Sequence, residues 1–488
     1  MIKKIQQDFS YYSHEFKDNY RKGVHRLRTI LASRAQAQAF VSNAGGVAVV
    51  LGYEPETPDK NAQELYALLA ASPYIDDAVQ TFLGSIYEAG AESQDAMYAD
   101  SARCLEILHD PVMARAAGAG TVSAGKWIAT LAGQSCNLYR DMNAVAASDI
   151  VMTAVAASET AMAAVVSNAT ALNAVVTSQV ALNAVAASET AMAAVIGNVT
   201  ALNAVVTSQL AMNAVAASET AMTALIANTA AFNTVVTSHV AMNAVASSYV
   251  AVAAVYESAV AVEAVKANET AWATLTGASS AVMGKAAAKL AGLNPADYAD
   301  MAAIASSSTA MAAIAASQTA MAAIEKSQVA KDAIAASDMA TAKYAVGAAG
   351  LNPADYADMA AVAASQTAMA AVAASQTAMA AIAASSTART AITNSATAKN
   401  ALASSPLKTT VTKGNGNGWE NRTIRNGMGY LISCYNANSG GEAGSTWYKL
   451  DGAQTSQPAG TTNVGKFFTS SLAIYWWSST SSVTYIPC

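Results

Sequence analysis

Two pairs of aspartates have the spacing of a catalytic acid pair. Asp297 and Asp300 are three residues apart, and Asp355 and Asp358 repeat them in a second copy of Gly-Leu-Asn-Pro-Ala-Asp-Tyr-Ala-Asp-Met. Two carboxylates on one helical turn can serve as general acid and base. They also follow an Asn-Pro pair, where carboxylates stabilise the positive end of a helix. Because the whole segment is duplicated, we expect these aspartates to be structural.

Metal and nucleophile chemistry has little support in the sequence. The four histidines, His14, His25, His109 and His239, show no metal-ligand spacing, and there is no GxSxG, P-loop or dinucleotide-binding motif. Regularly spaced methionines are typical of core packing rather than of a copper site. We therefore expect no catalytic residue, no metal site, no cofactor and no enzymatic activity.

The four cysteines, Cys104, Cys136, Cys434 and Cys488, are too few for a disulfide scaffold and lack the CxxC spacing of a zinc site. Free thiols are the expectation, with Cys434–Cys488 as the one weak candidate for a disulfide.

Aromatic residues near the C-terminus offer a binding chemistry instead. Four of the six tryptophans are Trp419, Trp447, Trp476 and Trp477. Trp, Tyr and Arg most often carry binding energy, so the candidate receptor-binding residues are Arg425, Trp447, Tyr448, Trp476 and Trp477. The alternative is that these aromatics form a strand core. Since side chains alternate along a strand, one of Trp476 and Trp477 must face away from the other.

These aromatics belong to a region of distinct composition, residues 406–488. Alanine gives way to Gly, Ser, Thr, Asn and aromatics, and Gly414-Asn-Gly-Asn-Gly418 is expected to be a hinge. Short β-branched and aromatic runs between Gly-rich turns predict a small β-rich distal tip.

A decapeptide repeat fills residues 141–405 and must position that tip. A large apolar residue recurs at every tenth position, as in Met152, Met162 and Leu172, and a second, usually valine, follows three residues later. Ser or Asn fills the eighth place. A larger period is also present, because 156–185, 186–215 and 216–245 are three copies of one 30-residue unit. Repeats this short must stack on their neighbours or on identical chains.

Alanine favours helix, but ten residues at 100° each fall about 80° short of three full turns. Something must relieve this mismatch once per repeat. Asp110-Pro111 and the two Asn-Pro pairs have the form of a helix N-cap followed by proline. By analogy each repeat is a short helix that restarts at its Ser or Asn. The alternatives are a continuous coiled coil with a wet stripe and, less favoured, a β-solenoid.

Residues 1–140 have ordinary complexity and predict a helical domain. The segment 2–40 is charged and amphipathic, Gly45-Gly46 interrupts it, and 54–59 reads as a loop. Helical patterns follow near 61–71, 74–89 and 95–117. The fold class is therefore mainly α, with a helical N-terminal domain, a long fibrous shaft and a small β-rich tip.

Composition excludes several classes of partner. The net charge of −6 argues against nucleic acid. The sequence has no stretch of roughly 18 strongly apolar residues, so we expect no membrane insertion. The first residues lack the apolar segment of a secretory signal. Within 151–256 the only charges are Glu159, Glu189 and Glu219. So few charges, with an apolar stripe on every repeat, predict a parallel homotrimer whose stripes align.

The tandem repeats, such as Ala364-Ser-Gln-Thr-Ala-Met-Ala-Ala-Val372, resemble those of tail-fibre and related appendage proteins of tailed bacteriophages, especially myovirus-like phages of enteric bacteria. The resemblance covers roughly 141–400 and implies a virion fibre. Its N-terminal domain would contact other virion proteins, and its tip would recognise a host glycan or outer-membrane protein. It carries no catalytic residue.

Other functions stay open. A collar whisker or side fibre would have a purely structural role. A bacterial adhesin would need a secretion signal and an anchor. An ice-binding solenoid is suggested by Thr160, Thr170 and Thr190, but Val180 and Leu210 interrupt that column. A glycan-degrading tip would need placed carboxylates, and the tip offers Glu420, Glu442 and Asp451.

Overall fold

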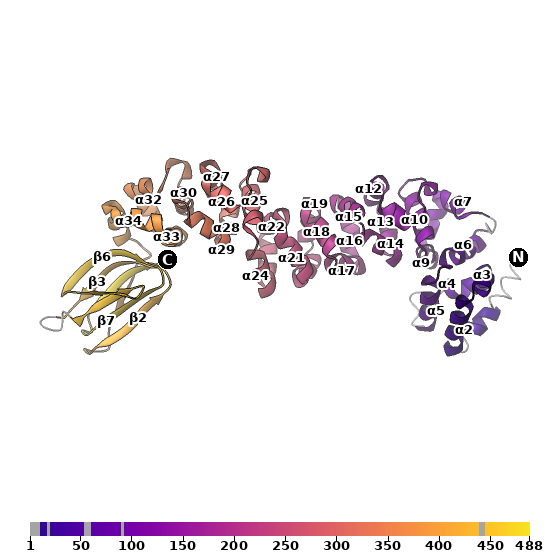
Figure 1. The fold of residues 1–488 in the computed structure, drawn as a ribbon, viewed down its shortest axis with the longest axis horizontal. Coiled ribbons are helices and arrows are strands. Elements are labelled where there is room, and N and C mark those ends of the chain that lie inside the picture. The colour runs from indigo at the N-terminus through magenta and orange to yellow at the C-terminus, as the bar shows by residue number, and fades with distance from the viewer. Residues whose placement is uncertain (1–9, 17–19, 53–59, 89–91, 439–444) are drawn as a thin grey trace. The chain divides into compact units, whose positions relative to one another are not determined.

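The computed structural model describes residues 10–16, 20–52, 60–88, 92–438 and 445–488. The protein is mainly helical, with two small antiparallel sheets near its C-terminus (Figure 1). It forms two compact units, Met1–Val245 and Ala246–Cys488, and the boundary between them in the sequence falls inside the repeat zone.

The first helices of unit 1 follow the expected patterns, with differences at their ends. They are α2 (Tyr20–Ala32), α3 (Arg34–Val41), α4 (Ala44–Leu51), α5 (Lys60–Ala70) and α6 (Ile75–Ile86). Gly45 and Gly46 lie inside α4, so they do not interrupt the chain as expected. The break comes at Asn43, whose side chain caps α4 by accepting from the Gly46 amide. The expected loop 54–59 lies outside the described residues.

The pattern near 95–117 is three helices rather than one. They are α7 (Gln94–Ala99), α8 (Ser101–His109) and α9 (Pro111–Ala117). The Asp100 and Asp110 side chains each accept two backbone amides at a helix start, and Pro111 occupies the first helical position. Helices that restart at a cap every ten residues therefore begin before residue 141.

The repeats of unit 1 are short separate helices, which confirms the restart model. After α10 (Thr121–Leu131) and α11 (Met142–Ala146) they are α12 (Asp149–Ala157), α13 (Glu159–Val166), α14 (Ala169–Val176), α15 (Gln179–Ala187), α16 (Glu189–Gly197), α17 (Val199–Thr207), α18 (Gln209–Ala217), α19 (Glu219–Ala227), α20 (Thr229–Thr237) and α21 (His239–Ser247).

A single extended residue separates most of these helices; where two residues intervene, as between α13 and α14, the second is the extended cap. Ser188 has φ −109° and ψ 122°, and its Oγ accepts from the Ala191 amide at 3.2 Å. Asn198 does the same for Ala201 at 3.0 Å. The chain bends by 99° between α12 and α13 and by 105° between α16 and α17. This bend at the cap absorbs the angular mismatch of a ten-residue helical repeat.

Three helices complete one turn of a solenoid. α12 packs on α15 and α15 on α18, and likewise α13 on α16 and α16 on α19. The cap serines also join successive turns, since Ser178 Oγ donates to the Ala146 carbonyl at 2.6 Å and Ser238 Oγ to Val206 at 2.7 Å. Both bonds span 32 residues, close to the 30-residue period of the sequence. One sequence unit is thus one turn.

The apolar stripe is buried within a single chain. Met192, Val195 and Leu202 are 0, 3 and 6 % exposed, and the alanine before each large residue, such as Ala191, is 0 % exposed. The helices of each turn enclose the stripe without a second chain. The stripe therefore no longer supports a trimer, and the number of chains stays a prediction.

Three longer segments interrupt the regular repeat. Each has an 11-residue helix, a left-handed glycine, a 3₁₀ turn and an aspartate N-cap. The first runs from α10 through Gly133 (φ 72°) and η1 (Cys136–Leu138) to Asp141. The sequence pattern had disclosed only the later two. In those, Asp300 and Asp358 cap helices, while Asp297 and Asp355 accept from Asn294 and Asn352. The paired aspartates are structural, as expected.

Unit 2 contains a solenoid of the same kind, in which α22 packs on α25 and α27 on α30. Its helices are α22 (Tyr249–Glu257), α23 (Ala259–Lys266), α24 (Glu269–Thr276), α25 (Ser280–Leu290), η2 (Pro295–Asp297), α26 (Met301–Ser306), α27 (Ser308–Ala316), α28 (Gln318–Lys326), α29 (Gln328–Ala335), α30 (Asp338–Ala348), η3 (Pro353–Asp355), α31 (Met359–Ala364), α32 (Gln366–Val372), α33 (Gln376–Ala384), α34 (Ser386–Asn394) and α35 (Ala396–Ala403).

The C-terminal region is a sandwich of two four-stranded antiparallel sheets. Its strands are β1 (Thr409–Thr412), β2 (Glu420–Asn426), β3 (Gly429–Asn436), β4 (Trp447–Leu450), β5 (Ala453–Ser456), β6 (Gly460–Phe468), β7 (Ser471–Trp476) and β8 (Ser482–Pro487). The strand orders are β1-β8-β3-β6 in the first sheet and β2-β7-β4-β5 in the second. Leu431, Phe468, Ile474 and Trp476 are 0 % exposed between the sheets.

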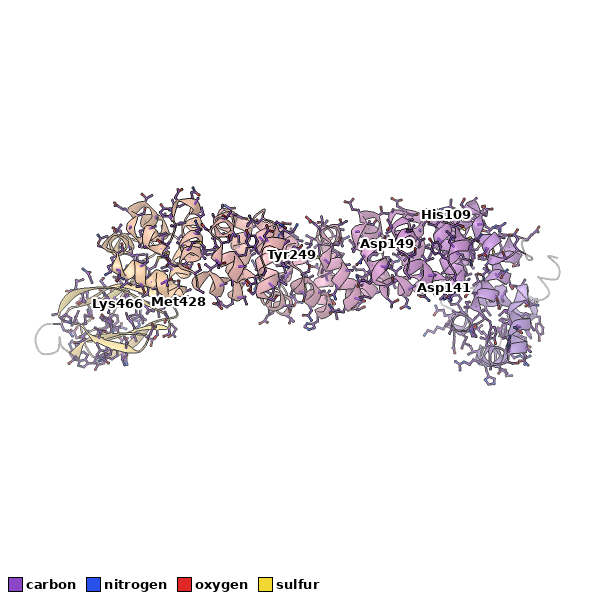
Figure 2. The ribbon with its side chains drawn as sticks, turned by 45° about the horizontal axis from the view of Figure 1, so that its top comes forward. His109, Asp141, Asp149, Tyr249, Met428 and Lys466 are labelled. Carbon is purple, nitrogen blue, oxygen red and sulfur yellow. The ribbon has the colours of Figure 1, made fainter. Side chains whose placement is uncertain are left out.

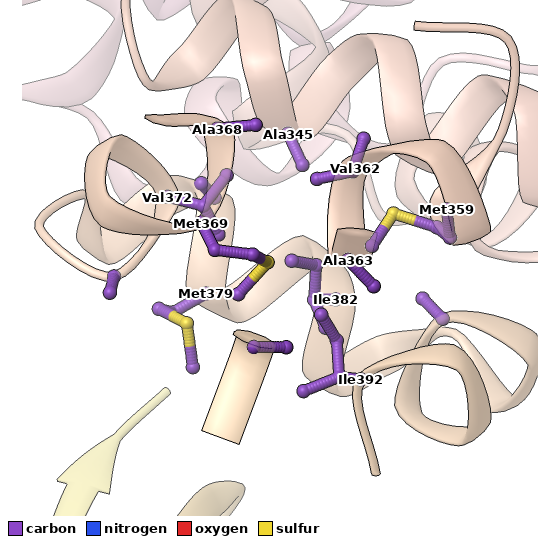
Figure 3. Packing of buried hydrophobic residues seen from close by; sticks show 14 of the residues in the cluster. Ala345, Met359, Val362, Ala363, Ala368, Met369, Val372, Met379, Ile382 and Ile392 are labelled. Atoms are coloured by element: carbon purple, nitrogen blue, oxygen red, sulfur yellow. The ribbon is translucent and has the colours of Figure 1, made fainter. Parts of the chain in front are cut away.

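The first sheet also covers the end of the solenoid. Tyr430 and Ile486 pack into the same apolar cluster as Met379, Ile392 and Leu402. Figure 3 shows Met369, Met379, Ile382 and Ile392 converging from successive helices on this cluster. In Figure 1, β3 and β6 lie beside α33 and α34, with β2 and β7 beyond them. The order of layers is therefore solenoid, first sheet, second sheet.

The glycine run 414–418 is not a hinge between shaft and tip, contrary to the expectation. It follows β1 and so lies inside the sandwich, where it joins β1 to β2. The Gly418 amide donates to the Trp477 carbonyl at 2.9 Å, and the Ser479 amide to Asn417 Oδ1 at 3.0 Å. Positive φ values at Gly414 and Gly416 serve this tight connection.

Two further expectations concern cysteines and membranes. All four cysteines are free; Cys434 lies opposite Val483 in the sandwich core, while Cys488 borders the solenoid cluster, so the disulfide prediction is wrong. None of the described helices alone has the length and hydropathy of a membrane span. Six pairs of consecutive helices reach them together, each bent by more than 40° at its break.

Candidate functional site: an aromatic face on the sandwich

The outer face of the second sheet carries a row of aromatic rings, formed by Trp419, Tyr475, Trp447 and Trp477 and called here the aromatic face. Strand register brings the rings together, because Tyr475 on β7 lies opposite Trp447 on β4 and opposite Asn421 on β2. Trp419 precedes Asn421 by two residues and so points to the same side. Trp419 is 37 % exposed, and the other three rings are half-buried.

The rings form a stack across three adjacent segments. Tyr475 is nearly parallel to Trp419, with centroids 4.7 Å apart and planes at 6°, and nearly parallel to Trp447 at 5.2 Å and 17°. Two parallel rings this close must lie on opposite faces of Tyr475, which therefore presents its edge outward. Trp477 meets Trp419 edge-on at 5.4 Å. The stack holds the aromatic side chains in place before any ligand arrives.

Polar groups border the stack. Lys449 Nζ lies 4.6 Å from the centre of the Trp447 ring, a cation–π distance. Asn421 and Thr423 are exposed on β2, and Gln454 and Ser456 on β5. Ser456 lies opposite Trp447, and Gln454 lies opposite Lys449. The face thus combines apolar ring area with amide and hydroxyl groups that can donate and accept hydrogen bonds.

The candidate residues from the sequence divide into two groups. Trp447 and Trp477 lie on the aromatic face. Tyr448 is 5 % exposed and Trp476 0 % exposed in the sandwich core, so neither presents a ring to a surface ligand. Trp476 and Trp477 do face opposite ways, as strand alternation predicted.

Arg425 has a structural role. Its Nε donates to the Met428 carbonyl at 2.8 Å and its Nη2 to the Cys488 carbonyl at 2.9 Å. These bonds tie β2 to the C-terminal end of β8.

Sequence reasoning missed Trp419, Tyr475 and Lys449 as members of the face. The alternation rule carries a usable signal, because it places Tyr475 and Trp477 on one side of β7 once Trp476 is assigned to the core. The neighbouring strands could not be identified in this way, since their pairing depends on the order β2-β7-β4-β5.

The carboxylates of the tip do not form a catalytic pair among the described residues. Asp451 accepts the backbone amides of Thr469, Ser470 and Ser471 at 2.9, 2.6 and 3.1 Å. Burial alone would raise its pKa, but these hydrogen bonds outweigh burial and hold the pKa well below the usual range. Glu420 begins β2, and Glu442 lies outside the described residues.

No group of three or more His, Cys, Asp or Glu side chains in the described part of the chain has a metal-binding arrangement. Two surface hollows of unit 2, with volumes of about 550 and 440 Å³, are lined by residues 315–377 and 366–406 and not by the rings of the aromatic face.

No protein-family model matches the chain, and no curated protein is significantly similar to it in sequence.

Proposed function

We propose that this protein is a structural appendage of a tailed-bacteriophage particle, a tail fibre whose aromatic face contacts the host cell surface. The resemblance of the decapeptide repeats supports the phage assignment. The N-terminal helices would bind other virion proteins, and the solenoid would carry the sandwich as a fibrous shaft. The protein would act in the virion, without catalysis.

The observation that carries the binding role is the order of the layers. One face of the first sheet is used to cover the end of the solenoid, and the sandwich core lies between the sheets. The outer face of the second sheet has neither task, yet it carries Trp419, Trp447, Tyr475 and Trp477. Exposed aromatic clusters on soluble proteins typically mark interaction sites.

The experiment compares Tyr475→Ala, which removes the centre of the stack, with Tyr435→Ala. Tyr435 is a matched control, because it is an exposed tyrosine of the same sandwich, 42 % accessible, on the first sheet. Binding of purified protein to outer-membrane vesicles of enteric bacteria is measured. Loss of a central aromatic contact typically costs 2 kcal/mol or more, roughly 30-fold in Kd. Equal binding by wild type and Tyr475→Ala, or no binding by correctly folded wild type, would overturn the receptor role.

The main alternative is a purely structural role, as in a collar whisker or side fibre. The cover that Tyr430 and Ile486 give to the solenoid end favours it, because solenoids need capped ends. In that case Tyr475→Ala leaves adsorption unchanged, while Tyr430→Ser destabilises the adjoining helices. A bacterial surface adhesin is the remaining alternative, and it predicts that the protein is found on the bacterial surface and not in purified phage particles.

A further inference from the structure

The solenoid of unit 1 has three sides of different chemistry. Because three helices make one turn, every third helix lies on the same side. Side A consists of α13, α16 and α19, side B of α14, α17 and α20, and side C of α12, α15, α18 and α21. A 30-residue sequence period therefore keeps each side distinct along the stack, whereas a 10-residue period would make the sides alike.

Between residues 151 and 245 charge is confined to side A, although the first helix of side C begins at Asp149. Between residues 151 and 245 the only charged residues are Glu159, Glu189 and Glu219, each at the first position of a side A helix. The equivalent positions on side C hold Gln179, Gln209 and His239. Interfaces between proteins are depleted of charge at their centre, so side C and side B are suited to contact and side A is not.

Side C also carries an apolar column. At the second position of its successive helices stand Ile150, Val180, Leu210 and Val240, of which Ile150 is 74 % and Leu210 37 % exposed. The same position on side A holds Thr160, Thr190 and Thr220. The second position of the side B helices holds threonine or alanine. An exposed valine, Val199, stands at the first position of α17 on that side. Val180 and Leu210, which interrupt the column of threonines in the sequence, thus belong to a separate apolar column on side C.

Amide pairs accompany the apolar column on α15 and α18. Gln179 Nε2 donates to Asn183 Oδ1 at 2.7 Å, and Gln209 Nε2 to Asn213 Oδ1 at 2.8 Å. This bond uses one hydrogen of the Gln amide and the Asn oxygen, so the Gln oxygen can still accept and the Asn amide can still donate. Two such surfaces facing each other can therefore exchange hydrogen bonds.

We propose that side C of unit 1 is the surface through which this chain associates with a second copy of itself, side by side and in parallel. In that arrangement the columns coincide at every turn, because both chains have the same 30-residue period. Contact through side A would instead oppose rows of glutamates and is disfavoured by like-charge repulsion. Asp149, labelled in Figure 2, lies at the first turn of side C and bounds the uncharged column. The inference goes beyond the proposed function and does not depend on receptor binding.

The test compares equal charges placed on two sides. The double variant Val180→Glu/Leu210→Glu adds two charges to side C, and Thr190→Glu/Thr220→Glu adds them at the same repeat position on side A. Wild type should have two or three times the 49.6 kDa of one chain by light scattering. The side C variant should dissociate at a protein concentration at least tenfold higher than the side A variant does. Far-ultraviolet circular dichroism checks that helix content is retained.

Cysteine cross-linking is a second measurement, and its side C substitution does not change the charge of that side. Under mild oxidation Gln209→Cys should form a disulfide between chains, and Glu189→Cys should not. A monomeric wild type, equal weakening by both charge variants, or equal cross-linking at both positions would each overturn the proposal.

Discussion

At the scale of single residues, the cap serine does two tasks. Ser188 Oγ accepts from the Ala191 amide, and its hydroxyl hydrogen is donated to the Ala156 carbonyl of the preceding turn. The first bond begins a helix, and the second fixes the stacking of turns. The first bond accounts for Ser or Asn in the eighth place of these repeats, although alanine is the better helix former.

Ser188→Ala should therefore destabilise the solenoid by about 1–2 kcal/mol, the usual cost of losing an N-cap together with one hydrogen bond. Ser167→Ala is the control, because Ser167 Oγ donates only to carbonyls of the preceding helix, those of Ala163 at 2.7 Å and Ala164 at 3.2 Å. The control should change stability by less than about 0.5 kcal/mol. Urea denaturation followed by circular dichroism measures both, and equal midpoints for the two variants would contradict the dual role.

Asp451 makes the sandwich sensitive to acid. Its pKa in the folded protein lies below the unfolded value of about 3.9, so the ionised carboxylate stabilises the fold above that value. This stabilisation should be lost as the pH falls below about 4. Asp451→Asn should be less stable than wild type at pH 7 and should lose less stability on acidification. Tryptophan fluorescence in denaturant, with Thr423→Ala as an exposed control, tests this; parallel pH profiles for wild type and Asp451→Asn would contradict it.

Individual residues also show what sequence can and cannot predict. The caps and the opposed orientation of Trp476 and Trp477 followed from local rules. Tyr448 and Arg425 were placed wrongly, because burial and backbone partners depend on which strands pair. The Trp419–Tyr475–Trp447 stack joins residues up to 56 positions apart through strand register, which no local pattern encodes.

At the scale of elements, each helix ends because the next residue of the repeat is an N-cap, and not because its residues have low helix propensity. The single extended residue at each cap is compatible with a following proline, which needs an extended predecessor and has no amide to lose at the first helical position. Pro111 after Asp110 is a natural example.

Glu189→Pro should therefore be tolerated, because Glu189 is the first residue of α16 and follows Ser188 in its extended conformation. Ala194→Pro should cost about 3 kcal/mol or more, since position 194 is inside α16 and its amide bonds within the helix. Thermal unfolding of the two variants distinguishes these outcomes. Equal damage from both prolines would contradict separate helices.

The existence of short helices could be inferred from the angular mismatch, but their stacking could not. Nothing in a decapeptide says whether the buried partner of Met192 is another turn or another chain. The bend of about 100° at each cap decides it, because three such bends nearly close a turn. Because of these bends, the duplicated 30-residue sequence unit corresponds to one turn of the solenoid.

At the scale of the whole molecule, that unit makes a prediction about deletions. Removing 186–215 takes out one complete turn and joins Val185 to Ala216, which opens with the same Ala-Ala-Ser-Glu-Thr-Ala-Met as Ala186 does. Every later helix stays on its own side. Removing 186–195 preserves the decapeptide pattern and its caps but shifts every later helix of unit 1 by one side, so that Glu219 arrives on side C.

Both deletions should fold, with helix content per residue unchanged, because each leaves the Ser or Asn caps and the apolar stripe intact. They should differ in association. The 30-residue deletion keeps side C uncharged and should retain the oligomeric mass of wild type. The 10-residue deletion ends the apolar column after Val180 and adds a charge to it, and should require at least tenfold more protein to associate. Light scattering over a dilution series measures this. If the two deletions associate equally well, the three sides are equivalent, and the 30-residue period records only how the repeat was duplicated.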